Sequence, residues 1–226
     1  MDKVVVSLGG SILIPNEDDI EFLKEIASLL LRVSEELDII VVCGGGRISR
    51  YYISGGRELG ATVEELDEMG IQVTRLNARL LQLALGGRGN RNIPETPEDA
   101  VKMKNPGMIV TMGGTEPGHT TDAVAALVAR AWKADRIVNA TSVDAVYSDD
   151  PKVVKDAKRF TLLSFEDFFS IVDEGGHDAG QTDVFDREGA MIVKEDRIPV
   201  FVVHGRDLDE LESAIRGGDI RGTRVI

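Results

Sequence analysis

Residues 4–11 read Val-Val-Val-Ser-Leu-Gly-Gly-Ser, a short apolar run that ends in two adjacent glycines. An apolar, β-branched run of this length is typical of a strand that is covered on both faces. Four similar runs follow along the chain, at 39–43, 108–112, 136–140 and 199–203. Amphipathic stretches separate them, and this alternation predicts an α/β protein, a three-layer sandwich with a mainly parallel central sheet.

Helical patterns connect the expected strands. They lie at roughly 18–36, 47–59, 65–85, 121–133, 164–174, 187–196 and 207–216. Gly, Asn and Pro residues predict a loop over 86–98, and the stretch 142–163 is also loop-like. We expect a single domain over residues 1–226, with one lobe at about 1–140 and a second at about 141–226.

Composition limits the classes of protein to which the chain can belong. Its 226 residues carry 26 Lys plus Arg against 39 Asp plus Glu, a net charge of −13. Such acidity opposes general binding to nucleic acids or anionic membranes, so we expect neither partner. The lone Cys43 excludes an intramolecular disulfide. The sequence shows neither a signal peptide nor a long apolar segment. Together with the single cysteine, these features predict a cytoplasmic protein.

Glycines follow the first three expected strands at the point where each strand ends. They occur in Gly9-Gly10-Ser11, Gly44-Gly45-Gly46 and Gly113-Gly114-Thr115. Right-handed crossovers place the carboxyl ends of parallel strands along one edge of the sheet. Glycines allow the backbone to approach an anion closely and to direct N–H groups at phosphate oxygens. A single glycine pair is more often a tight turn, but three at one edge favour a phosphate site.

Two arginines follow the second glycine loop. Arg47 and Arg50 are three residues apart on an expected helix, so both lie on one face of its first turns. Beside a glycine loop, they favour contact with phosphate. The alternative is a pair of exposed arginines that neutralise nearby acids.

The third loop continues to Asp122 and is rich in hydrogen-bond donors. Residues 113–122 read Gly-Gly-Thr-Glu-Pro-Gly-His-Thr-Thr-Asp, directly before an apolar helical pattern. Backbone N–H, hydroxyl and imidazole groups at the start of a helix can bind an anion. Thr121 or Asp122 could instead simply cap the helix, a contribution of about 1 kcal/mol.

A family resemblance rests on these motifs and their order. The chain has Ser-Leu-Gly-Gly-Ser at 7–11, Val-Cys-Gly-Gly-Gly-Arg at 42–47, Gly-Ile-Gln-Val-Thr-Arg at 70–75, the 113–122 loop, and Thr-Ser-Val-Asp-Ala-Val-Tyr-Ser-Asp-Asp-Pro at 141–151. Nearly end to end, it resembles the archaeal-type uridylate (UMP) kinases of the amino-acid-kinase family. The 113–122 loop is the most specific part of the match.

The resemblance implies the amino-acid-kinase fold and transfer of the ATP γ-phosphoryl group to UMP, with Mg²⁺ accompanying ATP. It also implies a homohexamer built as a trimer of dimers. The ATP-binding residues that it implies are Gly9, Gly10, Gly46, Arg50, Thr141, Tyr147 and Asp150. The UMP-binding residues are Gly45, Asp67, Thr115, Glu116, Pro117, Gly118, His119, Thr120 and Thr121.

One position departs from many relatives. Ser7 stands where they carry a lysine that would neutralise the transferring phosphoryl group. Arg50 or Arg47 is the expected catalytic cation in its place. Asp122 and Asp144 are candidates for organising Mg²⁺ or the catalytic cations, although capping and turns explain them almost as well, and no metal ligand is assigned.

Two other functions stay open at this point. The first is another small-molecule kinase with the same fold, acting on a carbamate, an acidic amino acid or isopentenyl phosphate. The second is a nucleotide-binding or storage protein without turnover. The presence of Ser7 in place of the lysine leaves this alternative open.

Overall fold

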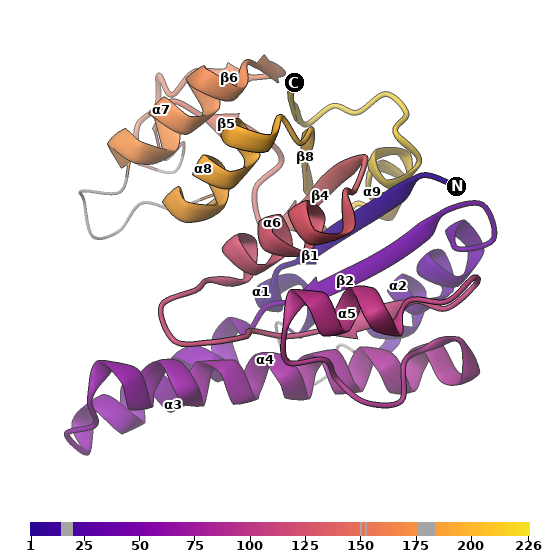
Figure 1. Ribbon diagram of the computed structural model, residues 1–226. Coiled ribbons are helices and arrows are strands. Elements are labelled where there is room, and N and C mark those ends of the chain that lie inside the picture. The colour runs from indigo at the N-terminus through magenta and orange to yellow at the C-terminus, as the bar shows by residue number, and fades with distance from the viewer. Residues whose placement is uncertain (15–19, 150, 152, 176–183) are drawn as a thin grey trace.

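The computed structural model describes residues 1–14, 20–149, 151, 153–175 and 184–226 (Figure 1). The strands are β1 (Lys3–Leu8), β2 (Asp38–Cys43), β3 (Val110–Met112), β4 (Arg136–Thr141), β5 (Val146–Tyr147), β6 (Arg159–Phe160), β7 (Leu162–Leu163), β8 (Val200–His204) and β9 (Thr223–Val225). Seven of them form one sheet in the order β3-β2-β1-β4-β8-β9-β7, and β5 pairs with β6 separately. All five predicted strands lie in the large sheet and pair in parallel, as expected.

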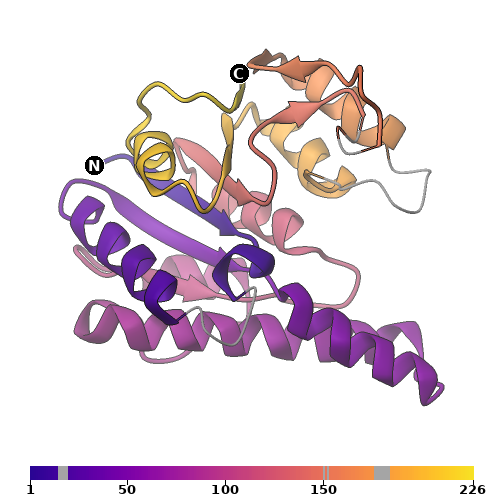
Figure 2. The same ribbon diagram turned by 180° about the vertical axis from the view of Figure 1, so that it is seen from behind.

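Helices cover both faces of this sheet. They are α1 (Gly10–Leu13), α2 (Ile20–Val33), α3 (Gly46–Glu58), α4 (Val63–Leu85), α5 (Pro97–Met103), α6 (Thr121–Trp132), α7 (Phe165–Gly175), α8 (Arg187–Asp196) and α9 (Leu208–Arg216), with a 3-10 turn at Gly86–Arg88. Side chains alternate along β1, so Val4 packs with α2, α4 and α9 while Val5 packs with α6 and α8. In Figure 2, which views the molecule from behind, α2 and α9 lie in front of the sheet. The three-layer α/β architecture is confirmed.

Some elements differ from the sequence-based expectation. The loop predicted over 86–98 ends early, because α5 begins at Pro97, with the Thr96 side chain accepting a hydrogen bond from the Asp99 N–H at 3.1 Å. The stretch 142–163 contains the short strands β5, β6 and β7. Strand β9, which lies between β8 and the edge strand β7, runs antiparallel to β8, so the sheet is not parallel throughout.

The strand register brings the glycine loops together. Leu8 pairs with both Cys43 and Ala140, and Val42 pairs with Met112. Since the next residues after Leu8, Cys43 and Met112 are glycines, all three loops leave the same edge of the sheet. From β1 the chain adds β2 and β3 on one side of the sheet and then β4 and β8 on the other. The sheet therefore has a topological switch point between β1 and β4, and such a point forms the ligand crevice in open α/β sheets. None of the described helices is both long and apolar enough to span a membrane.

Candidate functional site

The first two glycine loops touch each other through their backbones. A Cβ atom at Gly10 would lie 2.2 Å from the Gly46 nitrogen and 2.5 Å from the Gly44 oxygen. Gly46 also has a φ of +62°, which other residues rarely adopt. The Gly9 N–H donates to the Ala140 oxygen at 3.0 Å, which ties this loop to β4. Glycine is therefore required here by close approach as well as by conformation.

Helix α3 starts in the second loop and presents its N-terminus to this junction. The first N–H groups of a helix lack partners within the helix and carry partial positive charge. Arg47 and Arg50 lie in the first turns of α3, and both are exposed. Within the described part of the chain, neither guanidinium forms an ion pair. Both cations are thus available to a bound phosphate.

Three side chains of α4 hold the backbone of these loops. The Thr74 hydroxyl accepts from the Gly114 N–H at 2.7 Å, and Asn77 Nδ2 donates to the Gly44 oxygen at 2.8 Å. Arg75 donates to the oxygens of Gly114 and Thr115, both at 3.1 Å. No role for Thr74, Arg75 or Asn77 was predicted from the sequence. The available signal was a set of polar residues at inward positions of an amphipathic helix.

A pocket of about 340 Å³ lies between α3, α4 and the 113–122 loop. Six of the expected UMP-binding residues line it: Asp67, Glu116, Gly118, His119, Thr120 and Thr121. Thr115 and Pro117 belong to the same loop, and Gly45 packs against Ser49, which also lines the pocket. The structure thus brings the expected acceptor residues together.

Polar contacts fix the shape of this pocket. Asp67 Oδ2 accepts from the Gly118 N–H at 2.9 Å, so α4 and the loop are joined across it. His119 Nε2 lies 3.3 Å from Glu188 Oε1, and the Thr120 hydroxyl donates to Asp186 Oδ2 at 2.5 Å. Asp186 and Glu188 belong to the start of α8, so the loop also contacts the C-terminal part of the chain.

Asp122 lies behind the loop, at the start of α6. Its Oδ1 accepts a hydrogen bond from the Ser7 hydroxyl at 2.7 Å. Burial raises the pKa of the Asp122 carboxyl from 3.8 to about 7, the Ser7 hydrogen bond opposes this shift, and the charge of Asp186 adds to it. Position 7 therefore faces a carboxylate and not a cationic group.

Tyr147, an expected ATP-binding residue, belongs to a second group of polar contacts after β4. Asp144 accepts from the Tyr147 hydroxyl and from Arg159 Nε, both at 3.0 Å. Burial alone would raise the pKa of Asp144, but these hydrogen bonds lower it overall. Thr141 ends β4 and accepts from the Gly205 N–H at 2.9 Å. Asp150 lies outside the described residues.

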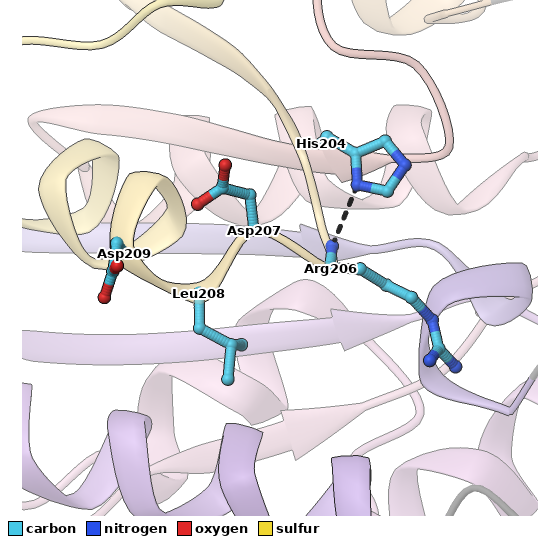
Figure 3. A pocket seen from close by; sticks show the side chains of 5 residues that line it. All are labelled: His204, Arg206, Asp207, Leu208 and Asp209. Carbon is cyan, nitrogen blue, oxygen red and sulfur yellow. Dashed lines mark hydrogen bonds between the residues drawn. The ribbon is translucent and has the colours of Figure 1, made fainter.

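A second pocket, of about 510 Å³, lies at the carboxyl end of β8 (Figure 3). Its lining comprises His204, Arg206, Asp207, Leu208 and Asp209. His204 Nδ1 accepts from the Arg206 backbone N–H at 3.3 Å. No sequence motif predicted this hollow beside the Thr141 end of β4.

Metal and thiol chemistry have little support from the protein side chains. Among the described residues, no three His, Cys, Asp or Glu side chains converge to hold a metal ion. Cys43 is buried in β2, and burial raises the pKa of its thiol to about 12. The thiol is therefore neutral and packs in the core.

Comparison with known proteins agrees with this geometry. Residues 2–204 match the model of the amino acid kinase family. The chain is 38% identical over 224 residues to the uridylate kinase of Methanobrevibacter smithii, with 99% of each chain covered. It is 40% identical to that of Haloquadratum walsbyi over 99% of this chain and 93% of the relative.

Solved structures give the same result. The crystal structure of uridylate kinase from Archaeoglobus fulgidus superposes with a TM-score of 0.89 at 38% identity, covering 100% of both chains. UMP kinase from Bacillus anthracis, at 23% identity and a TM-score of 0.81, shares the fold. The resemblance seen in the sequence is confirmed, and the chain belongs to the amino acid kinase family.

Proposed function

We propose that the chain transfers the γ-phosphoryl group of ATP to UMP, giving UDP and ADP. The observation that carries this proposal is the pocket enclosed by Asp67 and the 115–121 loop, which opens beside the joined glycine loops. Full-length similarity to several uridylate kinases supports the same acceptor. Nucleotides of both kinds would meet where β1, β2 and β4 end.

In this reaction an oxygen of the UMP phosphate attacks the γ-phosphorus of ATP. The bond between that phosphorus and the β,γ-bridging oxygen breaks, and ADP leaves with the electron pair. The acceptor is already anionic, so no general base is needed, and catalysis rests on positioning and charge neutralisation. The N-terminus of α3 and the cations Arg47 and Arg50 would supply that neutralisation.

The donor nucleotide would lie along Gly9, Gly10 and Gly46. Thr141 and Tyr147 would hold its nucleoside part, and Asp150 is predicted to bind ATP with them. The acceptor would contact Gly45, Asp67 and the 115–121 loop. The acceptor site would thus lie in the proposed lobe at about 1–140, whereas the donor site would take residues from this lobe and from the lobe at about 141–226.

Mg²⁺ would enter with ATP. Mg²⁺ in such sites is usually held by substrate phosphates and one or two carboxylates, not by a protein cage. Among the described residues, Asp122 is a candidate for such a carboxylate; it lies at the start of α6 and accepts a hydrogen bond from Ser7. When bound, the ion would neutralise phosphate charge. A cytoplasmic homohexamer remains part of the proposal, to be tested by light scattering on the purified protein.

A coupled ADP-release assay tests the function directly. The panel comprises UMP, CMP, dUMP, AMP, GMP, carbamate and isopentenyl phosphate, each with ATP and Mg²⁺. We expect UMP to be the preferred acceptor, ahead of CMP. Equal or faster turnover of carbamate or isopentenyl phosphate would assign a different kinase activity. Tight nucleotide binding without ADP release from any acceptor would indicate a binding protein.

A further inference from the structure

Helix α4 bonds two glycine loops that are far apart in the sequence. Thr74 and Arg75 hold the backbone at Gly114 and Thr115, as described above, and Asn77 holds the second loop. Asn77 Nδ2 donates to the Gly44 oxygen at 2.8 Å and lies 3.4 Å from the Gly45 oxygen. One helical turn therefore sets the positions of both loops relative to each other.

The environment of Asn77 is unusual for an amide. Its side chain is only 3% exposed, and its neighbours in α4, Ala78 and Leu81, belong to the apolar core. Burying an amide among apolar groups is unfavourable unless it is hydrogen-bonded, whereas an apolar residue would fill this site without that requirement. The amide thus serves the loop that it bonds.

The second loop is held from two directions. The Gly44 N–H donates to the Leu8 oxygen at 2.9 Å, while Asn77 holds the oxygens of Gly44 and Gly45 on the other side. With these carbonyls fixed, the next peptide groups are fixed too, and they carry the first N–H groups of α3. Those groups and the Gly10 contact define the junction between donor and acceptor.

We infer that Asn77 is a positioning residue for phosphoryl transfer. It orients the Gly44-Gly45-Gly46 backbone, so that the N-terminus of α3 faces the reacting phosphates. This inference rests on the proposed function. Small misplacements of groups around a reacting centre can lower the rate by up to about 100-fold, so loss of the amide should act on kcat.

Asn77→Asp is the sharpest test because it keeps the size of the side chain. A carboxylate cannot donate to the Gly44 oxygen and repels it, whereas a protonated carboxyl can donate. We expect kcat for UDP formation to fall about 10- to 100-fold near pH 8. The ratio of variant to parent kcat should rise as the pH is lowered toward about 6, since protonation restores a donor.

Asn90→Asp is the matched control. Asn90 is also buried, and its amide bonds the Thr111 backbone, donating to the oxygen at 2.9 Å and accepting from the N–H at 2.8 Å. This substitution should lower the urea midpoint but leave kcat of the folded enzyme unchanged. Both variants are assayed well below their unfolding transitions, with folded fractions measured by circular dichroism.

The outcomes distinguish failure of the proposed function from failure of the positioning role of Asn77. If the parent does not turn over UMP, the proposed function fails. If the parent is active and Asn77→Asp has parental kcat, or the same kcat loss as Asn90→Asp, the positioning role is refuted. Should Asn77→Asp not fold, Asn77→Ala removes the donor without adding a charge, and the same kcat criterion applies to it.

Discussion

Replacing Asp122 by Asn should stabilise the protein at neutral and alkaline pH. The Asp122 carboxyl is enclosed between Ser7 and Asp186, and its pKa rises from 3.8 to about 7 when the chain folds. Ionising it in the folded state is therefore unfavourable. An amide of the same shape has no charge to bury, and the Ser7 hydroxyl, which now bonds Oδ1 at 2.7 Å, can still donate to the Asn oxygen.

The size of the expected stabilisation follows from the pKa shift of Asp122. A pKa difference of about 3 units corresponds to about 4 kcal/mol at about 1.36 kcal/mol per unit. Asp122 keeps part of its surface exposed, and solvent reduces the penalty, so we expect about 2 to 4 kcal/mol at pH 8. The pKa is higher in the folded state than in the unfolded state. The parent's free energy of unfolding therefore falls as the pH rises from about 4 to about 7, and this contribution is constant above that.

Urea unfolding of parent and Asp122→Asn between about pH 4 and pH 8 measures this effect. The difference in free energy of unfolding should grow by about 2 to 4 kcal/mol across that window and then level off. Asp156→Asn, at an exposed carboxylate, is the control and should show no such growth. A pH-independent difference, or a less stable Asn variant at pH 8, would show that Asp122 ionises normally and would refute the reasoning.

Three further predictions concern the proposed activity. Arg50→Ala should lower kcat at least about 100-fold with UMP affinity nearly intact, and Arg47→Ala should do less; a rise in the KM for UMP alone would instead assign Arg50 to the acceptor. Asp67→Asn should weaken UMP binding and affect dUMP less, as measured by the two KM values, and an unchanged UMP-to-dUMP ratio would place Asp67 outside the ribose site. Gly10→Ala would set a methyl group 2.2 Å from the Gly46 nitrogen, so ATP turnover should be lost or the midpoint of thermal unfolding should fall; parental values of both would contradict the loop contact.

Local sequence features were sufficient to predict much of the fold. The five apolar runs became strands because a continuous β-branched run of about five residues has few alternatives in a chain of this composition. The glycine loops were visible for a similar reason, since the absence of a Cβ is a property of the residue itself. The elements that were missed are short or lie at an edge, such as β7 and β9, where two or three residues carry too little pattern.

The candidate site was predicted as a set of loops but not as an arrangement. Sequence spacing could place Arg47 and Arg50 on one helix face, since both belong to a single local element. It could not show that Asn77 would bond Gly44, 33 positions earlier, because only tertiary packing brings α4 under that loop.

The same holds for Ser7 and Asp122, which are 115 positions apart in the chain. Alone, Ser7 suggested a lost cation, and Asp122 suggested a helix cap. Only the packing of α6 beside β1 joined them and buried the carboxyl, because a pKa shift depends on which groups and how much solvent surround it. The sequence determined which groups the site contains, and the tertiary structure determined their distances and their charge.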